Sequence, residues 1–197
     1  MSIKTYQRKR DFSETPEPQG RTRSPGKLLR FVVQQHDAHT MHFDFRLEVD
    51  GVLKSWAVPK GPSIDLRVRR LAVPTEDHPL EYGGFEGVIP PRQYGAGAVI
   101  VWDRGTYRNL TRDSSGGSKN PARAIRDGHF VFDLKGHKLT GRFVLQRVGR
   151  GRDRRWFLIK GREENPSCRG EPVATQRKSV LSGRTLQELA RKESSSR

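Results

Sequence analysis

Short runs in which apolar and polar residues alternate dominate the chain from residue 27 onward. The runs are five to nine residues long and rich in β-branched and aromatic side chains, which is typical of β-strands. The predicted strands are Leu28–Gln34, Met41–Val49, Val52–Val58, Arg69–Val73, Ala98–Trp102, Phe130–Leu134, Lys138–Gln146 and Arg155–Ile159. Eight short strands favour a barrel or a sandwich. We expect a mainly β, single-domain β-barrel of about eight strands with one or two short flanking helices.

The segments between these runs carry turn and helix signals that agree with a β fold. Asp50-Gly51 separates two predicted strands by two residues, which is the strongest short-range signal for a hairpin. Residues 111–121 are rich in serine, glycine and charge and predict a flexible loop. Helical patterns occur at Ala122–Arg126 and Thr185–Arg191. The connections are therefore mostly short turns.

Composition divides the chain into three parts. Residues 1–26 combine prolines, serines and charges without apolar periodicity, so we expect an extended arm that forms no regular structure alone. Residues 27–165 hold the predicted barrel, and residues 166–197 form a basic tail with a short helix. Thr185 and Glu188 have the spacing of a capping box at the start of that helix. A length of 197 residues suits one domain with a core better than two.

The chain is strongly basic. Its 38 lysines and arginines outnumber 22 acidic residues and give a formal net charge of +16. The positive electrostatic field of such a charge favours a polyanionic partner, and nucleic acid is the partner that we prefer. An anionic membrane fits less well, because the sequence shows neither a run of 18 apolar residues nor an amphipathic basic helix. We expect a monomer that does not associate with membranes.

Cysteine content and the first residues bear on the cellular compartment. Cys168 is the single cysteine, so the chain forms no internal disulfide, and its setting indicates an incidental thiol rather than a nucleophile. The first ten residues, MSIKTYQRKR, lack the apolar stretch of a signal peptide. These features predict a cytoplasmic protein.

The run Met41–Val49 carries the strongest chemical signal. Its alternation places His42, Asp44 and Arg46 on one face of a strand. An imidazole and a carboxylate two residues apart suit a divalent transition metal, and His36, six residues before His42, lets a loop bring a third ligand to that face. The guanidinium group of Arg46 is then placed to donate two N–H bonds to a phosphate bound at the metal. Taken alone, a His-x-Asp pair is more often an ordinary solvated strand face.

A second cluster of titratable residues follows. Residues 76–82 place His78 among carboxylates, ahead of a glycine-rich segment. A histidine there has the chemistry to donate a proton to a leaving oxygen or to bind a phosphoryl oxygen, although a structural role is the commoner one. Lys60 and Arg70 add cations whose role is either phosphate binding or plain surface charge.

Several segments taken together resemble one known family, the 3′-phosphoesterase domain of bacterial DNA ligase D. The similar blocks are Phe31–Arg46, Lys54–Pro62, Leu71–Tyr82, Phe85–Pro90 and Tyr94–Gly105. They run in order through most of residues 5–160. Weaker similarity to segments that flank the domain occurs at Lys9–Phe12, Thr15–Pro18 and Ser179–Ala190. One departure is Arg92, at a position where the family pattern leads us to expect a turn glycine.

The resemblance implies a manganese-dependent enzyme on a β-barrel core that acts on DNA primer-template 3′ ends during non-homologous end joining. Two activities come with it. One removes a terminal 3′-ribonucleoside and leaves a 3′-phosphate, and the other hydrolyses that phosphate to a 3′-hydroxyl. Termini that carry a 3′-ribonucleotide or a 3′-phosphate are the implied substrates. A separately encoded ligase, polymerase or end-binding protein is a further implied partner.

The resemblance also implies roles for individual residues. It makes His36, His42 and Asp44 the metal ligands and brings Arg46 and His78 to the scissile phosphate. Supporting active-site positions are Lys60, Arg70, Glu76 and Tyr82, followed by Gln34, Arg10, Asp11 and Glu17. Because some of these residues lie in the arm, the resemblance implies that the arm folds over the metal, in contrast to the disorder that its composition predicts.

Two other function classes fit parts of the pattern. Two histidines and one carboxylate on a β-barrel also form the facial triad of non-haem iron oxygenases, although the charge of +16 and the neighbouring Arg46 favour a phosphate ligand. A non-catalytic basic module that binds nucleic acid is the other alternative. Binding by such a module would fall with salt and ignore chelators, whereas a metalloenzyme loses turnover when a chelator is added.

Overall fold

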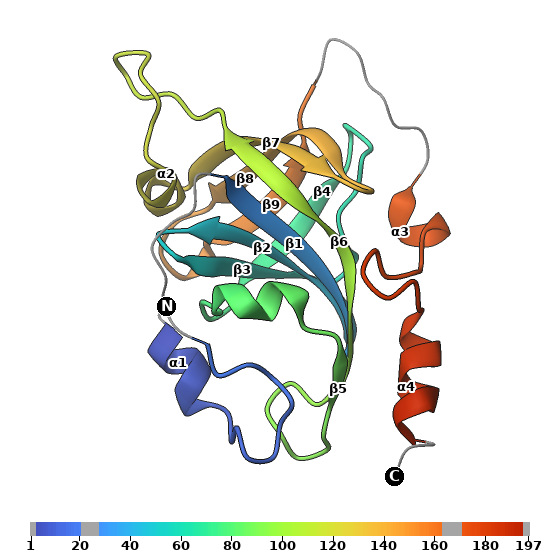
Figure 1. Cartoon of the computed structure of the whole chain (residues 1–197). Helices are drawn as coiled ribbons and strands as arrows, with labels where there is room; N and C mark the ends of the chain where they lie inside the picture. The colour runs from blue at the N-terminus through green and yellow to red at the C-terminus, as the bar shows by residue number, and fades with distance from the viewer. Residues whose placement is uncertain (1–2, 21–27, 163–170, 195–197) are drawn as a thin grey trace.

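The computed structural model of the chain describes residues 3–20, 28–162 and 171–194. The strands within these residues are β1 (Leu29–Asp37), β2 (Met41–Val49), β3 (Val52–Val58), β4 (Arg69–Pro74), β5 (Gly87–Ile89), β6 (Gly97–Asn109), β7 (His129–Gly136), β8 (Thr140–Val148) and β9 (Arg155–Lys160). Eight of them close into an antiparallel barrel in the order β1-β2-β3-β4-β9-β8-β7-β6, with β6 returning to β1 (Figure 1). The predicted barrel is confirmed.

Strand β6 differs most from its prediction, because it continues through Asn109 rather than ending at Trp102. Its first residues pair with β5 and its last residues pair with β7, while β1 runs along its other edge. Strand β5 was not predicted. Three residues are too few to show alternation.

Helices lie outside the barrel. They are α1 (Ile3–Arg8), α2 (Pro121–Asp127), α3 (Pro172–Thr175) and α4 (Leu186–Ser194), with 3₁₀ turns η1 (Leu80–Gly84) and η2 (Gly151–Asp153). The two predicted helices correspond to α2 and α4. The capping box is confirmed, since the backbone N–H of Thr185 donates to Glu188 Oε2 at 2.8 Å and that of Glu188 donates to Thr185 Oγ1 at 3.3 Å. The described residues contain no helix long and apolar enough to cross a membrane.

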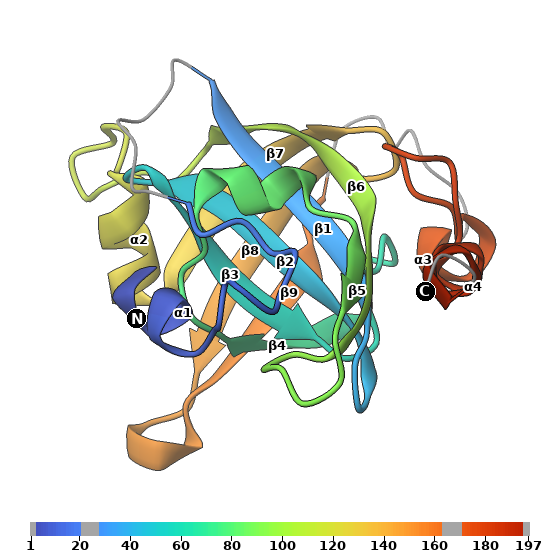
Figure 2. The same ribbon diagram turned by 60° about the horizontal axis from the view of Figure 1, so that its bottom comes forward.

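The arm corrects the prediction from composition. Residues 3–8 form helix α1, and residues 9–20 continue across the barrel surface in a defined path (Figure 2). Tyr6 explains this order, because its side chain is fully buried and its hydroxyl donates to the carbonyl of Pro18 at 2.6 Å. A helix of six residues is unstable in isolation, so its stability comes from this packing.

The hairpin signal at Asp50-Gly51 is confirmed. Both residues have positive φ, 52° and 76°, as a type I′ turn requires, and they join β2 to β3 with Val49 opposite Val52. In this register the inward-facing residues of β2 lie beside those of β3, and the outward-facing residues of the two strands are neighbours in the same way.

Two apolar clusters lie on opposite faces of the sheet, and strands β1 and β6 contribute residues to both. The cluster inside the barrel is dominated by aromatic side chains, among them Phe31, Phe45, Trp102, Phe132 and Phe143. The second cluster lies outside the barrel, where the arm, η1 and β5 cover the sheet, and includes Tyr6, Val32, Tyr82, Ile89 and Val101. The outer face of β1 and β2 is therefore an interior between two layers.

The C-terminal segment packs against a different side of the barrel. Leu186 and Leu189 of α4 form a small cluster with Ala98 and Ile100 of β6. Figure 1 shows α4 beside β5 and β6, away from α1. Cys168 lies outside the described residues.

Candidate metal centre and active site

The candidate site lies on the outer face of β1 and β2. Phe43, Phe45 and Leu47 point into the barrel core, so the alternate residues of β2 point outward. These outward side chains are buried by the covering layer, with Asp44 6% and Arg46 2% exposed. The alternative of an ordinary solvated strand face therefore does not hold.

The three predicted ligands come together from two neighbouring strands. His36 does not lie on a loop, as its spacing suggested, but on β1, directly opposite His42 of β2. Asp44 Oδ2 lies 3.7 Å from His36 Nδ1 and 3.7 Å from His42 Nε2. One ligand atom from each residue falls within 4.8 Å of the others, a spacing that suits a shared ion.

Backbone carbonyl groups orient both imidazoles. His36 Nε2 donates to the carbonyl of Gly95 at 2.8 Å, which leaves the lone pair of Nδ1 directed at Asp44. His42 Nδ1 donates to the carbonyl of Thr40 at 2.8 Å, which leaves Nε2 directed the same way. Metal-binding histidines are commonly oriented by such second hydrogen bonds. The residues therefore fit a divalent transition metal ion.

Charge around Asp44 also suits a metal ligand. Burial opposes ionisation of this carboxyl, but the Arg46 guanidinium and the neighbouring imidazoles of His36 and His42 outweigh burial and hold its pKa well below the usual range. The nearby Asp44 carboxylate raises the pKa of His42. The site therefore presents an ionised carboxylate at neutral pH.

Arg46 is held rigidly beside the three ligands. Its Nε donates to Gln34 Oε1 at 2.8 Å, one Nη donates to Ser55 Oγ at 2.9 Å, and the other donates to Asp44 at 3.0 Å. Gln34 is fixed in turn, because its Nε2 donates to the carbonyls of Tyr82 and Phe85, each at 3.0 Å. A guanidinium anchored in this way is preorganised for an anion.

His78 lies between two arginines. Its Nδ1 is 2.8 Å from Arg46 Nη1 and 2.9 Å from the carbonyl of Glu76, and its Nε2 is 3.5 Å from Arg10 Nη2. A guanidinium donates and a carbonyl accepts, so one Nδ1 contact at a time is a hydrogen bond. Burial and the two neighbouring cations hold the pKa of His78 well below its usual value. The ring is therefore neutral at pH 7.

The arm contributes charged side chains to the same pocket. Arg10 forms ion pairs with Glu17 at 2.8 Å and with Glu76 at 3.2 Å, and its guanidinium lies 3.9 Å from the centre of the Tyr6 ring. Lys9 also pairs with Glu76, at 3.1 Å. The arm thus lies over the pocket that holds His36, His42 and Asp44.

These side chains enclose a pocket of about 280 Å³. The predicted residues that line it are His36, His42, Asp44, Arg46, His78, Glu76, Tyr82 and Arg10. Five others are not among its lining residues: Gln34 and Glu17 contact Arg46 and Arg10, and the remaining three lie elsewhere. Lys60 is exposed, Arg70 faces Glu171 at 3.7 Å, and the Asp11 carboxylate accepts hydrogen bonds from Ser13.

Sequence reasoning missed other residues around the pocket. Tyr94 lines it and is 47% exposed, and Lys9 Nζ lies 2.9 Å from its hydroxyl and 4.2 Å from the centre of its ring. Ser55, which binds Arg46, was also missed. The sequence feature that pointed to this segment was Arg92, which stands where the family pattern has a turn glycine. Its φ of 72° lies in the left-handed region that favours glycine. This turn brings Tyr94 and Gly95 to the pocket.

Comparison with known proteins gives one family. Residues 34–147 match the model of the DNA ligase D 3′-phosphoesterase domain. A multifunctional non-homologous end joining protein LigD from Pseudomonas aeruginosa is 51% identical over 188 residues, which cover 92% of this chain and 21% of the relative. The multifunctional non-homologous end joining DNA repair protein LigD of Mycobacterium tuberculosis is 48% identical over 145 residues, which cover 73% of this chain and 18% of the relative. The chain spans about a fifth of the length of these relatives.

Proposed function

Because this chain belongs to the family of DNA ligase D 3′-phosphoesterase domains, we propose that it is a metal-dependent phosphoesterase that processes DNA 3′ ends. The observation that carries the proposal is the group of His36, His42 and Asp44, whose free ligand atoms converge beside the buried guanidinium of Arg46. These residues would put a cation-binding site and an anion-binding side chain in one pocket. A phosphate ester is the substrate class that uses both.

The metal would be held by His36 Nδ1, His42 Nε2 and Asp44. When bound, a divalent ion supplies Lewis-acid charge to a phosphoryl oxygen and lowers the pKa of a coordinated water. Three protein ligands suit manganese, zinc, cobalt or iron, and we propose manganese on the basis of the family resemblance. A ligand set of this kind selects a metal partly by availability.

Arg46 and His78 would contact the scissile phosphate. Arg46 is anchored by Gln34, Ser55 and Asp44, so its remaining donor capacity faces the pocket without loss of side-chain entropy on binding. His78 is neutral and offers one N–H, which suits a hydrogen bond to a phosphoryl or leaving oxygen. Both groups stabilise the charge that develops on the phosphoryl oxygens.

Further residues would complete the pocket from the side of the arm. Arg10 adds positive charge near His78, and Glu17 and Glu76 fix its position. Tyr82 supports Arg46, whose guanidinium lies 4.9 Å from the centre of its ring. Lys60, Arg70 and Asp11 lie outside this pocket, and a role for them at the phosphate stays a prediction.

The proposed substrates are DNA primer-template 3′ ends that carry a terminal ribonucleotide or a 3′-phosphate. One pocket would serve both reactions, because each breaks an ester bond to the same phosphorus atom. The relatives are described as end-joining proteins, which supports a role in non-homologous end joining and contact with a ligase, a polymerase or an end-binding protein.

The test is incubation with a primer-template that has one 3′-terminal ribonucleotide, with and without Mn²⁺, and resolution of the products on a gel. We expect shortening to a 3′-phosphate and then conversion to a 3′-hydroxyl, both abolished by a chelator and by His42→Ala. A primer that is bound but never shortened would overturn the catalytic proposal and leave a nucleic-acid-binding module.

A further inference from the structure

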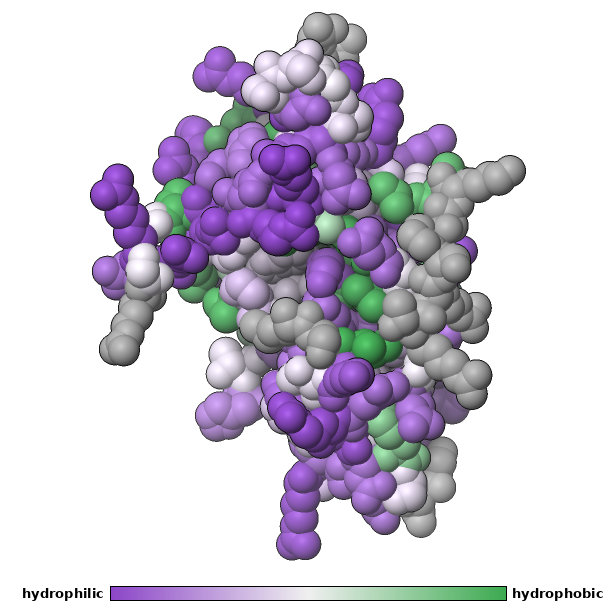
Figure 3. Space-filling model, turned by 90° about the vertical axis from the view of Figure 1, so that its left-hand side faces the viewer, coloured by the Kyte–Doolittle hydropathy of each residue, from purple (hydrophilic) through white to green (hydrophobic). Residues whose placement is uncertain are grey.

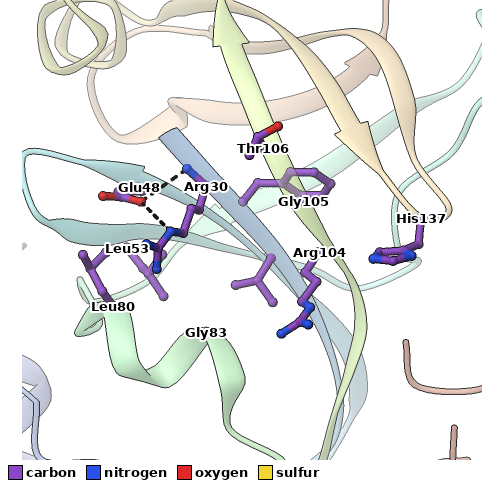
Figure 4. Close-up of a pocket in the computed structure, with 11 residues that line it drawn as sticks. Arg30, Glu48, Leu53, Leu80, Gly83, Arg104, Gly105, Thr106 and His137 are labelled. Atoms are coloured by element: carbon purple, nitrogen blue, oxygen red, sulfur yellow. Dashed lines mark hydrogen bonds and ion pairs between the residues drawn. The ribbon is translucent and has the colours of Figure 1, made fainter. Parts of the chain in front are cut away.

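A second groove, of about 380 Å³, lies beside the candidate site on the same outer face of the barrel. Val32 of β1 and Glu48 of β2 line it and continue the outward-facing rows that carry the metal ligands. Turn η1 separates the two spaces, because Leu80 and Gly83 line the groove whereas Tyr82 lines the metal pocket. Figure 4 shows the groove between η1 and the strands β1 and β6.

The rim of the groove is basic. Arg30, Arg104 and His137 come from three different segments and are all exposed (Figure 4). Within the described residues, no hydrogen bond or ion pair engages the side chain of Arg104 or His137. Glu48 is the acidic residue of the lining. It is 1% exposed, and its Oε2 accepts from the Arg30 backbone N–H at 3.3 Å and lies 3.9 Å from Arg30 Nε.

The ridge between the groove and the metal pocket carries little side-chain bulk. Gly83 and Gly84 follow Tyr82 at the end of η1, and Gly84 is exposed. A Cβ added at Gly84 would meet no atom within 4 Å, so the space above it is open. Consecutive glycines allow another backbone to approach closely. A polynucleotide strand could therefore pass from one space to the other.

Strand register gives the distance between the two spaces. Arg104 of β6 lies opposite Val32 of β1, and Val32 precedes the ligand His36 by four residues. Four residues of β-strand span about 13 Å. At about 3.4 Å of axial rise per nucleotide, this corresponds to about four base pairs of a duplex. The groove is thus close enough to hold the same DNA molecule whose end lies at the metal.

We propose that the groove lined by Arg30, Arg104 and His137 binds the phosphate backbone of the DNA duplex about four base pairs from the processed 3′ end. The inference rests on the proposed function and extends it from the terminal phosphate to the duplex behind it. The exposed arginines Arg30 and Arg104 on the rim, a net charge of +16 and an apolar floor of Val32 and Leu53 favour a nucleic acid over an acidic peptide.

The test pairs protein variants with substrates that lack one charge. Binding to a primer-template with a 3′-hydroxyl, which is not turned over, is measured by fluorescence anisotropy with Mn²⁺ present. Single phosphates in either strand are replaced one at a time by neutral methylphosphonates. Arg104→Ala and His137→Ala are the variants, because neither exposed side chain supports another residue. Arg67→Ala is the matched control, since Arg67 is 89% exposed and lies outside the groove.

We expect Arg104→Ala to weaken duplex binding several-fold and to reduce the slope of log affinity against log salt by about 1. A methylphosphonate about four base pairs from the 3′ end should weaken wild-type binding and have no effect on Arg104→Ala. Arg67→Ala should bind like the wild type. Equal sensitivity of wild type and Arg104→Ala at every phosphate position would overturn the proposal.

A short substrate separates this proposal from the proposed function. A dinucleotide with a 3′-phosphate is too short to reach the groove, so Arg104→Ala should dephosphorylate it at the wild-type rate. If the wild type processes neither the dinucleotide nor the full primer-template, the proposed activity is in error rather than the groove. If Arg104→Ala loses dinucleotide activity while remaining folded, Arg104 acts at the metal pocket and the groove assignment is wrong.

Discussion

At the scale of single residues, Arg46 joins every part of the candidate site. Its guanidinium donates to a glutamine, a serine and the carboxylate of Asp44, and it lies against His78. A lysine cannot reproduce this fork, because an ammonium group is a compact point charge. We predict that Arg46→Lys lowers kcat at least a hundredfold and destabilises the fold by about 1–3 kcal/mol through the buried groups left unpaired.

The measurements are the rate of 3′-phosphate release and the free energy of unfolding in urea. Arg108→Lys is the control, because the Arg108 side chain is 76% exposed and lies outside the pocket. Activity in Arg46→Lys close to that of the wild type would mean that charge alone is required there, and that the anchored geometry has no catalytic importance.

The sequence made part of this site predictable. Alternation in β2 put His42, Asp44 and Arg46 on one face, because side-chain direction in a strand depends on local geometry alone. Contacts that depend on the tertiary path were not visible in the same way. Lys9 and Tyr94 meet although 85 positions separate them, and Ser55 looked like an ordinary strand residue until β3 placed it beside Arg46.

At the scale of elements, the arm depends on one buried aromatic side chain. Tyr6 packs against His78 and Tyr82, with ring centroids 4.8 Å and 5.8 Å apart, and Arg10 covers its ring. We predict that Tyr6→Ala releases residues 3–20 from the barrel, at a cost of about 3–5 kcal/mol, and lowers activity because Arg10 leaves the pocket.

Limited proteolysis followed by mass spectrometry would detect cleavage within the released arm, and the activity assay would be run on the same sample. Lys4→Ala, on the exposed side of α1, should behave like the wild type. An arm that remains protected in Tyr6→Ala, with full activity, would contradict this role for Tyr6.

The C-terminal segment is fastened to the barrel by Lys138. Its Nζ donates to the carbonyls of Gln176 at 2.9 Å and Lys178 at 2.6 Å, and Trp102 Nε1 also donates to Gln176 at 2.7 Å. We predict that Lys138→Met, which leaves an acceptor unpaired, destabilises the protein by about 1–2 kcal/mol and exposes residues 171–194 to protease. Lys135→Met, at an exposed position of β7, is the control.

The same lysine predicts a pH dependence. Burial lowers the pKa of Lys138 to about 8, below the usual value of 10.5, so between these values the unfolded chain binds more protons than the folded one. The contribution of Lys138 to stability should therefore rise as pH increases from 8 to 10.5. Urea unfolding of wild type and Lys138→Met across this range would show it, and a difference that stays constant or shrinks would contradict it.

Elements with a local chemical signature were predictable, whereas those that depend on packing were not. The Asp50-Gly51 turn and the Thr185–Glu188 capping box are specified by neighbouring residues, and both are present. Helix α1 and strand β5 have no such signature. Helix α1 forms because Tyr6 is buried, and β5 forms because it pairs with the first residues of β6.

At the scale of the whole molecule, a closed barrel carries a second layer on one face, and the candidate metal site lies between the two layers. Hydrophilic side chains cover most of the surface in Figure 3, in keeping with the net charge of +16. The net charge indicates a polyanionic partner, but it does not show where on the molecule the active site lies. Burial of the polar face of β2 located it, because buried charges must be paired or bound to a metal.

We propose that hydrolysis depends on a metal ion held by His36, His42 and Asp44. The most direct measurement is the rate of phosphate release from a 3′-phosphorylated primer-template as a function of Mn²⁺ concentration, for the wild type and for His42→Ala. We predict a rate that rises to a plateau in the wild type, vanishes with chelator, and falls at least a hundredfold, about 3 kcal/mol, in His42→Ala without loss of folding. A wild-type rate that chelator leaves unchanged, or a His42→Ala rate equal to it, would contradict the account.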